Sequence, residues 1–148
     1  MLVRCLYASR VAKGSAASAL RGILEDSRVN NAKHGVTGVL ISAGDCFIQV
    51  LEGGRAQVSE TYNIITQDKR HKDVTLLHFE EIAQRGFEGW TMGEVSLDQA
   101  NPSLLLKYSA TMKFDPFSMA GSAVLALLSE LVTSGTVISK NSTRDRRS

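Results

Sequence analysis

The order of strand-like and helix-like segments constrains the fold of this 148-residue chain more than any other feature. Five short segments are rich in β-branched, aromatic and other apolar residues, as strands are, at residues 2–7, 36–41, 46–52, 74–79 and 90–95. Two segments between them repeat apolar residues every three or four positions, from Gly14-Ser15 to about Asn30-Asn31 and from about Ala56 to Gln67. This periodicity predicts amphipathic helices. The resulting order is β-α-β-β-α-β-β, with a tight hairpin at 43–45.

This order is typical of an α+β, ferredoxin-like fold with one extra strand and two helices on one face of the sheet. We assign residues 1–96 to this domain and residues 97–134 to a C-terminal helical extension. Within the extension, Asp115-Pro116 is typical of a helix start. The apolar run 123–132 predicts a helix packed on the free face of the sheet or on a partner. Residues 135–148 are polar and charged, and we expect them to be disordered.

Composition excludes several functional classes. The net charge is +2, which argues against a nucleic-acid-binding surface. No apolar run reaches the roughly 20 residues needed to cross a bilayer, and the N-terminus does not resemble a signal peptide. We therefore expect a cytoplasmic protein without a membrane segment. Cys5 and Cys46 lack the spacing of a metal site, so we expect buried thiols and no metal.

Gln49 is the most informative single residue, because it lies inside the otherwise apolar segment 47–53. A carboxamide has two donors and one acceptor oxygen, and leaving a buried polar group unpaired costs about 1–3 kcal/mol. In a ferredoxin-like sheet the first and third strands are central neighbours, so Tyr7 can meet Gln49 on one face. The pair is explained either by a phenol–amide hydrogen bond that satisfies both buried groups or by a bound ligand.

Other candidate residues have structural interpretations beside functional ones. Asn31 falls where the first helix is expected to end, so it is either a helix cap or a ligand contact. Trp90 and Met92 are two positions apart in a strand and are expected to share one face, as core residues or as a movable pair. Glu80 and Glu81 are expected at a solvated strand end. Nucleophile-elbow, zinc-protease, phosphate-loop and dinucleotide-binding motifs are missing, so the sequence does not predict an enzyme.

Several of these segments together carry a specific resemblance. They are residues 6–9 (Leu-Tyr-Ala-Ser), Asn30-Asn31, 35–40, 47–53 (Phe-Ile-Gln-Val-Leu-Glu-Gly), 68–71 and 87–92. In this order and spacing, the chain resembles the BLUF family of flavin-based blue-light sensors over residues 2–95. Tyr108-Ser109 and 114–116 are also similar to the C-terminal extension of short stand-alone members.

The resemblance implies a flavin cofactor, with FAD expected and FMN or riboflavin as alternatives. Its ring would lie between the two helices, with Asn31 at the pyrimidine edge and Gln49 between the ring and the Tyr7 hydroxyl. Asn30 would also bind the cofactor. Met92 or Trp90 would lie beside Gln49. Arg70 and His71 would lie toward the ribityl and phosphate end. Ile64 stands where many members have arginine, which bears on flavin preference.

The resemblance also implies a mechanism without substrate turnover. Blue light would cause Tyr7 to give an electron and a proton through Gln49, and recombination would leave Gln49 rotated or tautomerised. The new hydrogen bond to a flavin carbonyl would give a red-shifted signalling state. The signal would pass to a separate signalling protein or through a change in a homo-oligomer.

Two other functional classes fit the same fold. One is an enzyme, either a flavin-dependent oxidoreductase or an acylphosphatase-like hydrolase with Ser9-Arg10 near its phosphate loop. The other is an RNA-binding module, but the central strands lack the paired exposed aromatics of such modules. Fold alone does not decide function, and a visible spectrum separates the three classes.

Overall fold

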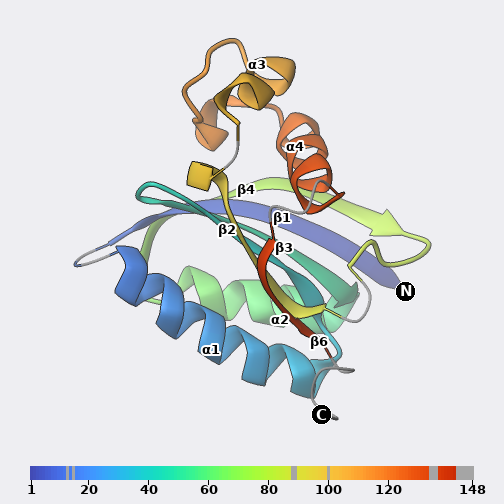
Figure 1. The fold of residues 1–148 in the computed structure, drawn as a ribbon. Coiled ribbons are helices and arrows are strands. Elements are labelled where there is room, and N and C mark those ends of the chain that lie inside the picture. Colours follow the sequence, from blue (N-terminus) through green and yellow to red (C-terminus); the bar gives the residue numbers. More distant parts are fainter. Residues whose placement is uncertain (13, 15, 88–89, 100, 134–136, 143–148) are drawn as a thin grey trace.

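The computed structural model describes residues 1–12, 14, 16–87, 90–99, 101–133 and 137–142. Its strands form one sheet in the order β4-β1-β3-β2-β5-β6 (Figure 1). They are β1 (Leu2–Val11), β2 (Thr37–Ala43), β3 (Cys46–Gly54), β4 (His71–Ile82), β5 (Trp90–Ser96) and β6 (Val137–Ser142). The four strands β4-β1-β3-β2 pair antiparallel, and β5 adds to β2 in parallel. The predicted ferredoxin-like fold with an extra strand is confirmed, including the central position of β1 beside β3.

The sheet is covered on both faces. The long helices α1 (Ala16–His34) and α2 (Arg55–Thr66) lie on one side, and the C-terminal segment lies on the other (Figure 1). That segment contains α3 (Leu105–Tyr108), α4 (Gly121–Thr133) and the short 3-10 turns Leu97–Gln99, Pro102–Leu104 and Pro116–Ser118. Because both faces are covered, every residue of β3 from Cys46 to Gly53 is buried.

The apolar run 123–132 packs against the chain's own sheet. Its residues Val124, Leu127, Leu128 and Leu131 join a cluster with the sheet residues Leu6, Val39, Ile41, Ile48 and Val50. A second cluster on the other face joins Ile23, Leu24 and Val58 of the helices to Cys5, Tyr7, Leu40 and Phe47. The first of the two alternatives for this run, packing on the free face of the sheet, is therefore the one observed.

We expect Leu128→Ala to lower the free energy of unfolding by about 2–5 kcal/mol, because Leu128 is fully buried between α4 and the sheet. Urea unfolding measures the change. The matched control is Leu106→Ala, since Leu106 is 52% exposed, and we expect it to cost less than about 0.5 kcal/mol. Equal losses in the two variants would show that α4 does not form part of the core.

Several boundaries differ from the sequence prediction, and β1 and β4 end later than expected, at Val11 and Ile82 instead of residues 7 and 79. The first helix does not end near Asn31 but continues to His34, and Gly35 then takes the left-handed backbone conformation (φ +67°) that ends many helices. Asn31 is therefore not a cap. The expected helix start at Ser15 lies outside the described residues. The fourth strand begins at His71 instead of residue 74, because its pairing with β1 continues to Val11.

The expected disorder of residues 135–148 does not hold for Val137–Ser142, which form β6 along β5. An edge strand presents unpaired backbone N–H and C=O groups that another segment can pair with. The β-branched residues Val137 and Ile138 favour that conformation. Residues 134–136 and 143–148 lie outside the described part of the chain.

Both cysteines are buried and free, as expected. Burial raises the pKa of the Cys5 thiol to about 12 and that of Cys46 to about 11, so neither thiol is ionised near neutral pH.

Over the described residues, no helix is both long and apolar enough to cross a membrane.

Candidate functional site

Tyr7, Gln49 and Met92 form a hydrogen-bonded trio on the face of the sheet that α1 and α2 cover. Tyr7 and Gln49 are direct partners in the register of β1 and β3. The Tyr7 hydroxyl donates to Gln49 Oε1, and Gln49 Nε2 donates to Met92 Sδ at 3.5 Å. All three side chains are at most 1% exposed. The structure thus brings together the tyrosine and the glutamine that the sequence singled out.

The chemistry of the trio fixes the orientation of the amide. A thioether sulfur accepts hydrogen bonds but cannot donate them, so the amide nitrogen faces Met92 and the amide oxygen faces Tyr7. The pKa of Tyr7 lies well above its usual value, chiefly because the phenol is buried, with smaller contributions from Cys5, Asp68 and Tyr62. Tyr7 therefore keeps its proton and acts as the donor to Gln49.

Helix α1 holds the start of β5 through two backbone carbonyls. Asn31 Nδ2 donates to the Thr91 carbonyl (3.1 Å), and Arg28 Nε donates to the Met92 carbonyl (3.1 Å). Sequence reasoning did not single out Arg28. Its position three residues before Asn31, on the same side of the helix, is the signal that points to it.

A cleft of about 180 Å³ opens between α1 and α2. Four residues that the resemblance assigned to the cofactor line it: Asn30, Asn31, Arg70 and His71. A larger hollow of about 600 Å³ lies between the β2–β3 turn and the C-terminal segment, but none of the predicted cofactor residues lines it. The smaller cleft is the better candidate because it carries the predicted donors.

Arg70 spans the cleft through ion pairs. Its Nη1 lies 2.9 Å from Asp26 Oδ2 on α1, and its Nη2 lies 2.6 Å from Asp68 Oδ2. Hydrogen bonding to Asp68 raises the pKa of Arg70, and hydrogen bonding to Arg70 lowers the pKa of Asp68. An anionic group that binds at this position must compete with these two carboxylates.

His71 is buried beside the trio. Its Nδ1 lies 2.8 Å from the Ser9 hydroxyl, and its ring makes edge contacts with Tyr7 and Phe47. The pKa of His71 lies below its usual value, mainly because burial disfavours the charged imidazolium. The imidazole is therefore neutral at pH 7.

The expectation that Trp90 and Met92 share one face is wrong. Met92 lies in the cluster beneath α1 and α2, whereas Trp90 lies in the cluster beneath α4. Strand alternation fails here because the pairing of β5 with β6 shifts register between these two residues. The Trp90 ring also lies over Gly93, where a Cβ atom would come within 2.5 Å of it. Met92 is therefore the residue beside Gln49.

The lining of the cleft has the chemistry that a flavin requires, but Tyr7, Gln49 and Met92 are not among its lining residues. A flavin ring has an apolar end and a pyrimidine end with N–H and C=O groups. The cleft offers the apolar side chains Ile23, Ile64 and Ile65, together with the carboxamides of Asn30 and Asn31. Cofactor sites commonly combine apolar walls with a few placed polar groups in this way. Ile64 lines the cleft itself, so no arginine is present at that position to bind the ribityl chain or phosphate.

The structure thus combines a ferredoxin-like sheet, a helix-lined cleft and a buried tyrosine–glutamine pair, the parts expected of the flavin-binding domain that the sequence resembles. The sequence model of the BLUF family, described as "Sensors of blue-light using FAD", matches residues 2–93. The chain belongs to this family, whose members sense blue light with a bound flavin.

Named relatives and solved structures agree with this placement. Photoactivated adenylate cyclase subunit beta of Euglena gracilis is 32% identical over 62% of this chain and 11% of that protein. The blue light- and temperature-regulated antirepressor BluF of Escherichia coli is 31% identical over 52% of this chain and 19% of that protein. The chain thus matches only a small part of these relatives.

Two solved structures match most of both chains. "BlsA photo-activated state" has a TM-score of 0.81 at 28% identity and covers 97% of this chain and 99% of that one. "BlrB - a BLUF protein, dark state structure" has a TM-score of 0.74 at 28% identity and covers 90% and 96%.

Proposed function

We propose that Tyr7 and Gln49 are the light-switched residues of this blue-light sensor, and that the flavin binds in the cleft between α1 and α2. The observation that carries the proposal is the chain of hydrogen bonds from Tyr7 through Gln49 to Met92. Each member is buried, so a change at Gln49 cannot be absorbed by solvent. Asn30, Asn31, Arg70 and His71 would hold the cofactor.

A bound flavin supplies the absorption of blue light and, once excited, an acceptor for one electron. Tyr7 would give up an electron and its hydroxyl proton and would regain both on recombination, so the cycle has no net redox change. Gln49 would return with its amide turned or tautomerised. A carboxamide has a donor end and an acceptor end, so turning it exchanges the two toward fixed neighbours. The site then has two discrete states.

We propose β5 as the element that reports the switch. Met92 contacts Gln49 through its sulfur and Arg28 through its carbonyl, so a turned amide that no longer donates to the sulfur changes the contacts of β5. A switch acts at a distance only when its two states differ in contact energy there. We propose that the output goes to a separate signalling protein or to a homo-oligomer, without catalysis by this chain. The cytoplasmic location stays a prediction.

Illumination of the flavin-loaded protein tests the proposal. We expect a yellow protein whose visible absorption shifts to the red under blue light and returns in the dark. A flavin spectrum that does not respond to light would contradict the proposed function. A colourless protein that takes up no added flavin would reopen the enzyme and RNA-binding alternatives.

We expect Asp26→Asn to strengthen binding of FMN relative to riboflavin by about two- to fivefold, the size typical of one exposed ion pair. The reason is that Arg70 loses one of its two carboxylate partners and becomes more available to a phosphate. Titration of apoprotein with both flavins measures the ratio. Glu25→Gln is the control, because Glu25 does not line this cleft. An equal change for both flavins would place the phosphate away from Arg70.

A further inference from the structure

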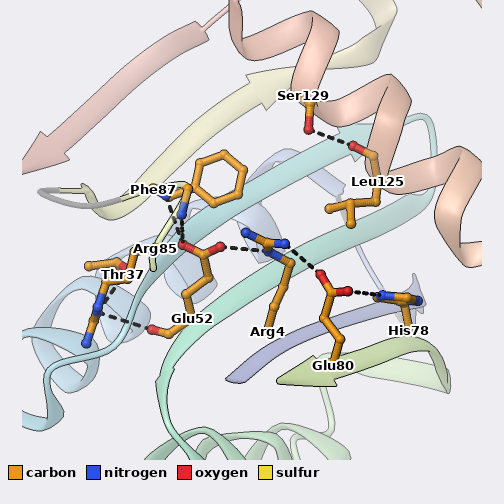
Figure 2. Close-up of polar contacts among 10 residues, drawn as sticks. Arg4, Thr37, Glu52, His78, Glu80, Arg85, Phe87, Leu125 and Ser129 are labelled. Atoms are coloured by element: carbon orange, nitrogen blue, oxygen red, sulfur yellow. Dashed lines mark hydrogen bonds and ion pairs between the residues drawn. The ribbon is translucent and has the colours of Figure 1, made fainter. Parts of the chain in front are cut away.

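A buried carboxylate lies on the face of the sheet opposite the cleft. Glu52 is fully buried near the end of β3, and its Oε2 accepts a hydrogen bond from Arg4 Nε at 2.7 Å. Arg4 also pairs with Glu80 on β4 (2.6 Å), which lies 3.1 Å from His78. Figure 2 shows Arg4 between the two carboxylates, and Arg4 is the register partner of both. The ion pairs therefore cross three adjacent strands.

The other oxygen of Glu52 holds the loop that leads into β5. Oε1 accepts from the backbone N–H groups of Gly86 (2.8 Å) and Phe87 (2.9 Å). The Arg85 side chain also holds the loop to this part of the sheet. Its Nη1 donates hydrogen bonds to the Glu52 carbonyl (3.3 Å) and to Thr37 Oγ1 (3.0 Å). Three consecutive loop residues thus hydrogen-bond to one residue of β3. Figure 2 shows Arg85 and Phe87 beside Glu52.

This loop sets the start of β5. The Trp90 N–H donates to the Phe87 carbonyl (3.1 Å), and the two rings lie 5.8 Å apart. Trp90 is thereby turned toward α4, and Met92 is left on the side of Gln49. From the opposite face, Asn31 and Arg28 hold the carbonyls of Thr91 and Met92. The first residues of β5 are therefore held from both sides of the sheet.

We propose that Glu52 is a positioning residue for the light switch, which anchors the entry to β5 and so keeps Met92 beside Gln49. The role in switching rests on the proposed function, whereas the anchoring does not. A buried ion pair is not by itself a source of stability. The specific geometry of Glu52, with Arg4 on one oxygen and two loop N–H groups on the other, explains why a charge is kept there. Hydrogen bonds to an ionised acceptor are also stronger than neutral ones.

The test is Glu52→Gln, with Glu80→Gln as the matched control. The amide in place of the Glu52 carboxylate has only one acceptor oxygen, so either Arg4 or the loop loses its partner. Glu80→Gln removes a carboxylate from the same arginine and leaves the loop contacts intact. Trp90 is the only tryptophan in the chain, so its fluorescence reports directly on the start of β5.

The experiment uses flavin-loaded protein in the dark. We expect Glu52→Gln to raise about tenfold the fraction of molecules in which residues 85–87 have detached from β3, because one hydrogen bond to a charged group is lost. Acrylamide then quenches Trp90 more strongly than in the wild type, and Glu80→Gln leaves quenching unchanged. We also expect Glu52→Gln to slow the return from the lit state, because Met92 must find its place beside Gln49 without the anchor.

Equal quenching in the two variants would overturn the proposal. If Glu52→Gln does not fold, Arg85→Ala replaces it, because it removes a tie to the loop and leaves the buried carboxylate paired. Greater quenching of Trp90 in Arg85→Ala supports the anchor, and unchanged quenching overturns it. If quenching of Trp90 increases in the variant but even the wild-type protein does not respond to light, the anchoring role of Glu52 is supported and the proposed function is contradicted.

Discussion

Tyr7→Phe is expected to bind flavin in normal amounts and to lose the light-induced red shift completely. The substitution removes only the hydroxyl, and the buried ring keeps its edge contacts with Tyr62 and His71. Without the hydroxyl there is no proton to pass to Gln49, so the amide has no cause to turn. The absorbance difference between illuminated and dark protein, at a measured ratio of flavin to protein, gives the result.

Tyr62→Phe is the matched control for this experiment. Tyr62 lies on α2 with its ring 5.8 Å from that of Tyr7, and the hydroxyl that contacts Gln49 is that of Tyr7. We expect this variant to keep the red shift. A normal light response in Tyr7→Phe would remove Tyr7 from the mechanism, whatever the control shows.

Gln49→Leu is expected to abolish the red shift as well and also to destabilise the protein. Leucine fills a similar volume but cannot donate to Met92 or accept from Tyr7, so the phenol hydroxyl remains buried without its partner. Such a group costs about 1–3 kcal/mol. Light difference spectra and urea unfolding measure the two effects separately.

Gln57→Leu serves as the control, because Gln57 lies on the exposed side of α2. We expect it to leave both the spectrum and the stability close to the wild type. Persistence of the red shift in Gln49→Leu would mean that the switch lies in another group.

The sequence predicted the sheet and the central pair for a clear physical reason. Hydrophobic periodicity separated strands from helices, and the ferredoxin-like order then placed the first and third strands side by side. Tyr7 and Gln49 could therefore meet on one face, and the register of the structure makes them direct partners.

The sequence did not predict side-chain placements and pairings that depend on more than the period of apolar residues. Strand alternation placed Trp90 and Met92 on one face, but the register of β5 shifts between them and Trp90 lies on the α4 side. Glu80 is partly exposed near the end of β4, as expected, but its ion pair with Arg4 of β1 was not predicted. Such pairings depend on register, which the sequence pattern does not supply. The strand Val137–Ser142 was missed because its polar composition is typical of a tail.

The central claim is that light changes the hydrogen bonding of the Gln49 amide. Infrared light-minus-dark spectra of flavin-loaded protein, with and without isotope-labelled glutamine, test it most directly. We predict amide bands that shift on labelling in the wild type and that disappear in Gln49→Leu but remain in Gln57→Leu. A red-shifted lit state whose infrared difference spectrum is unchanged by glutamine labelling would contradict the account.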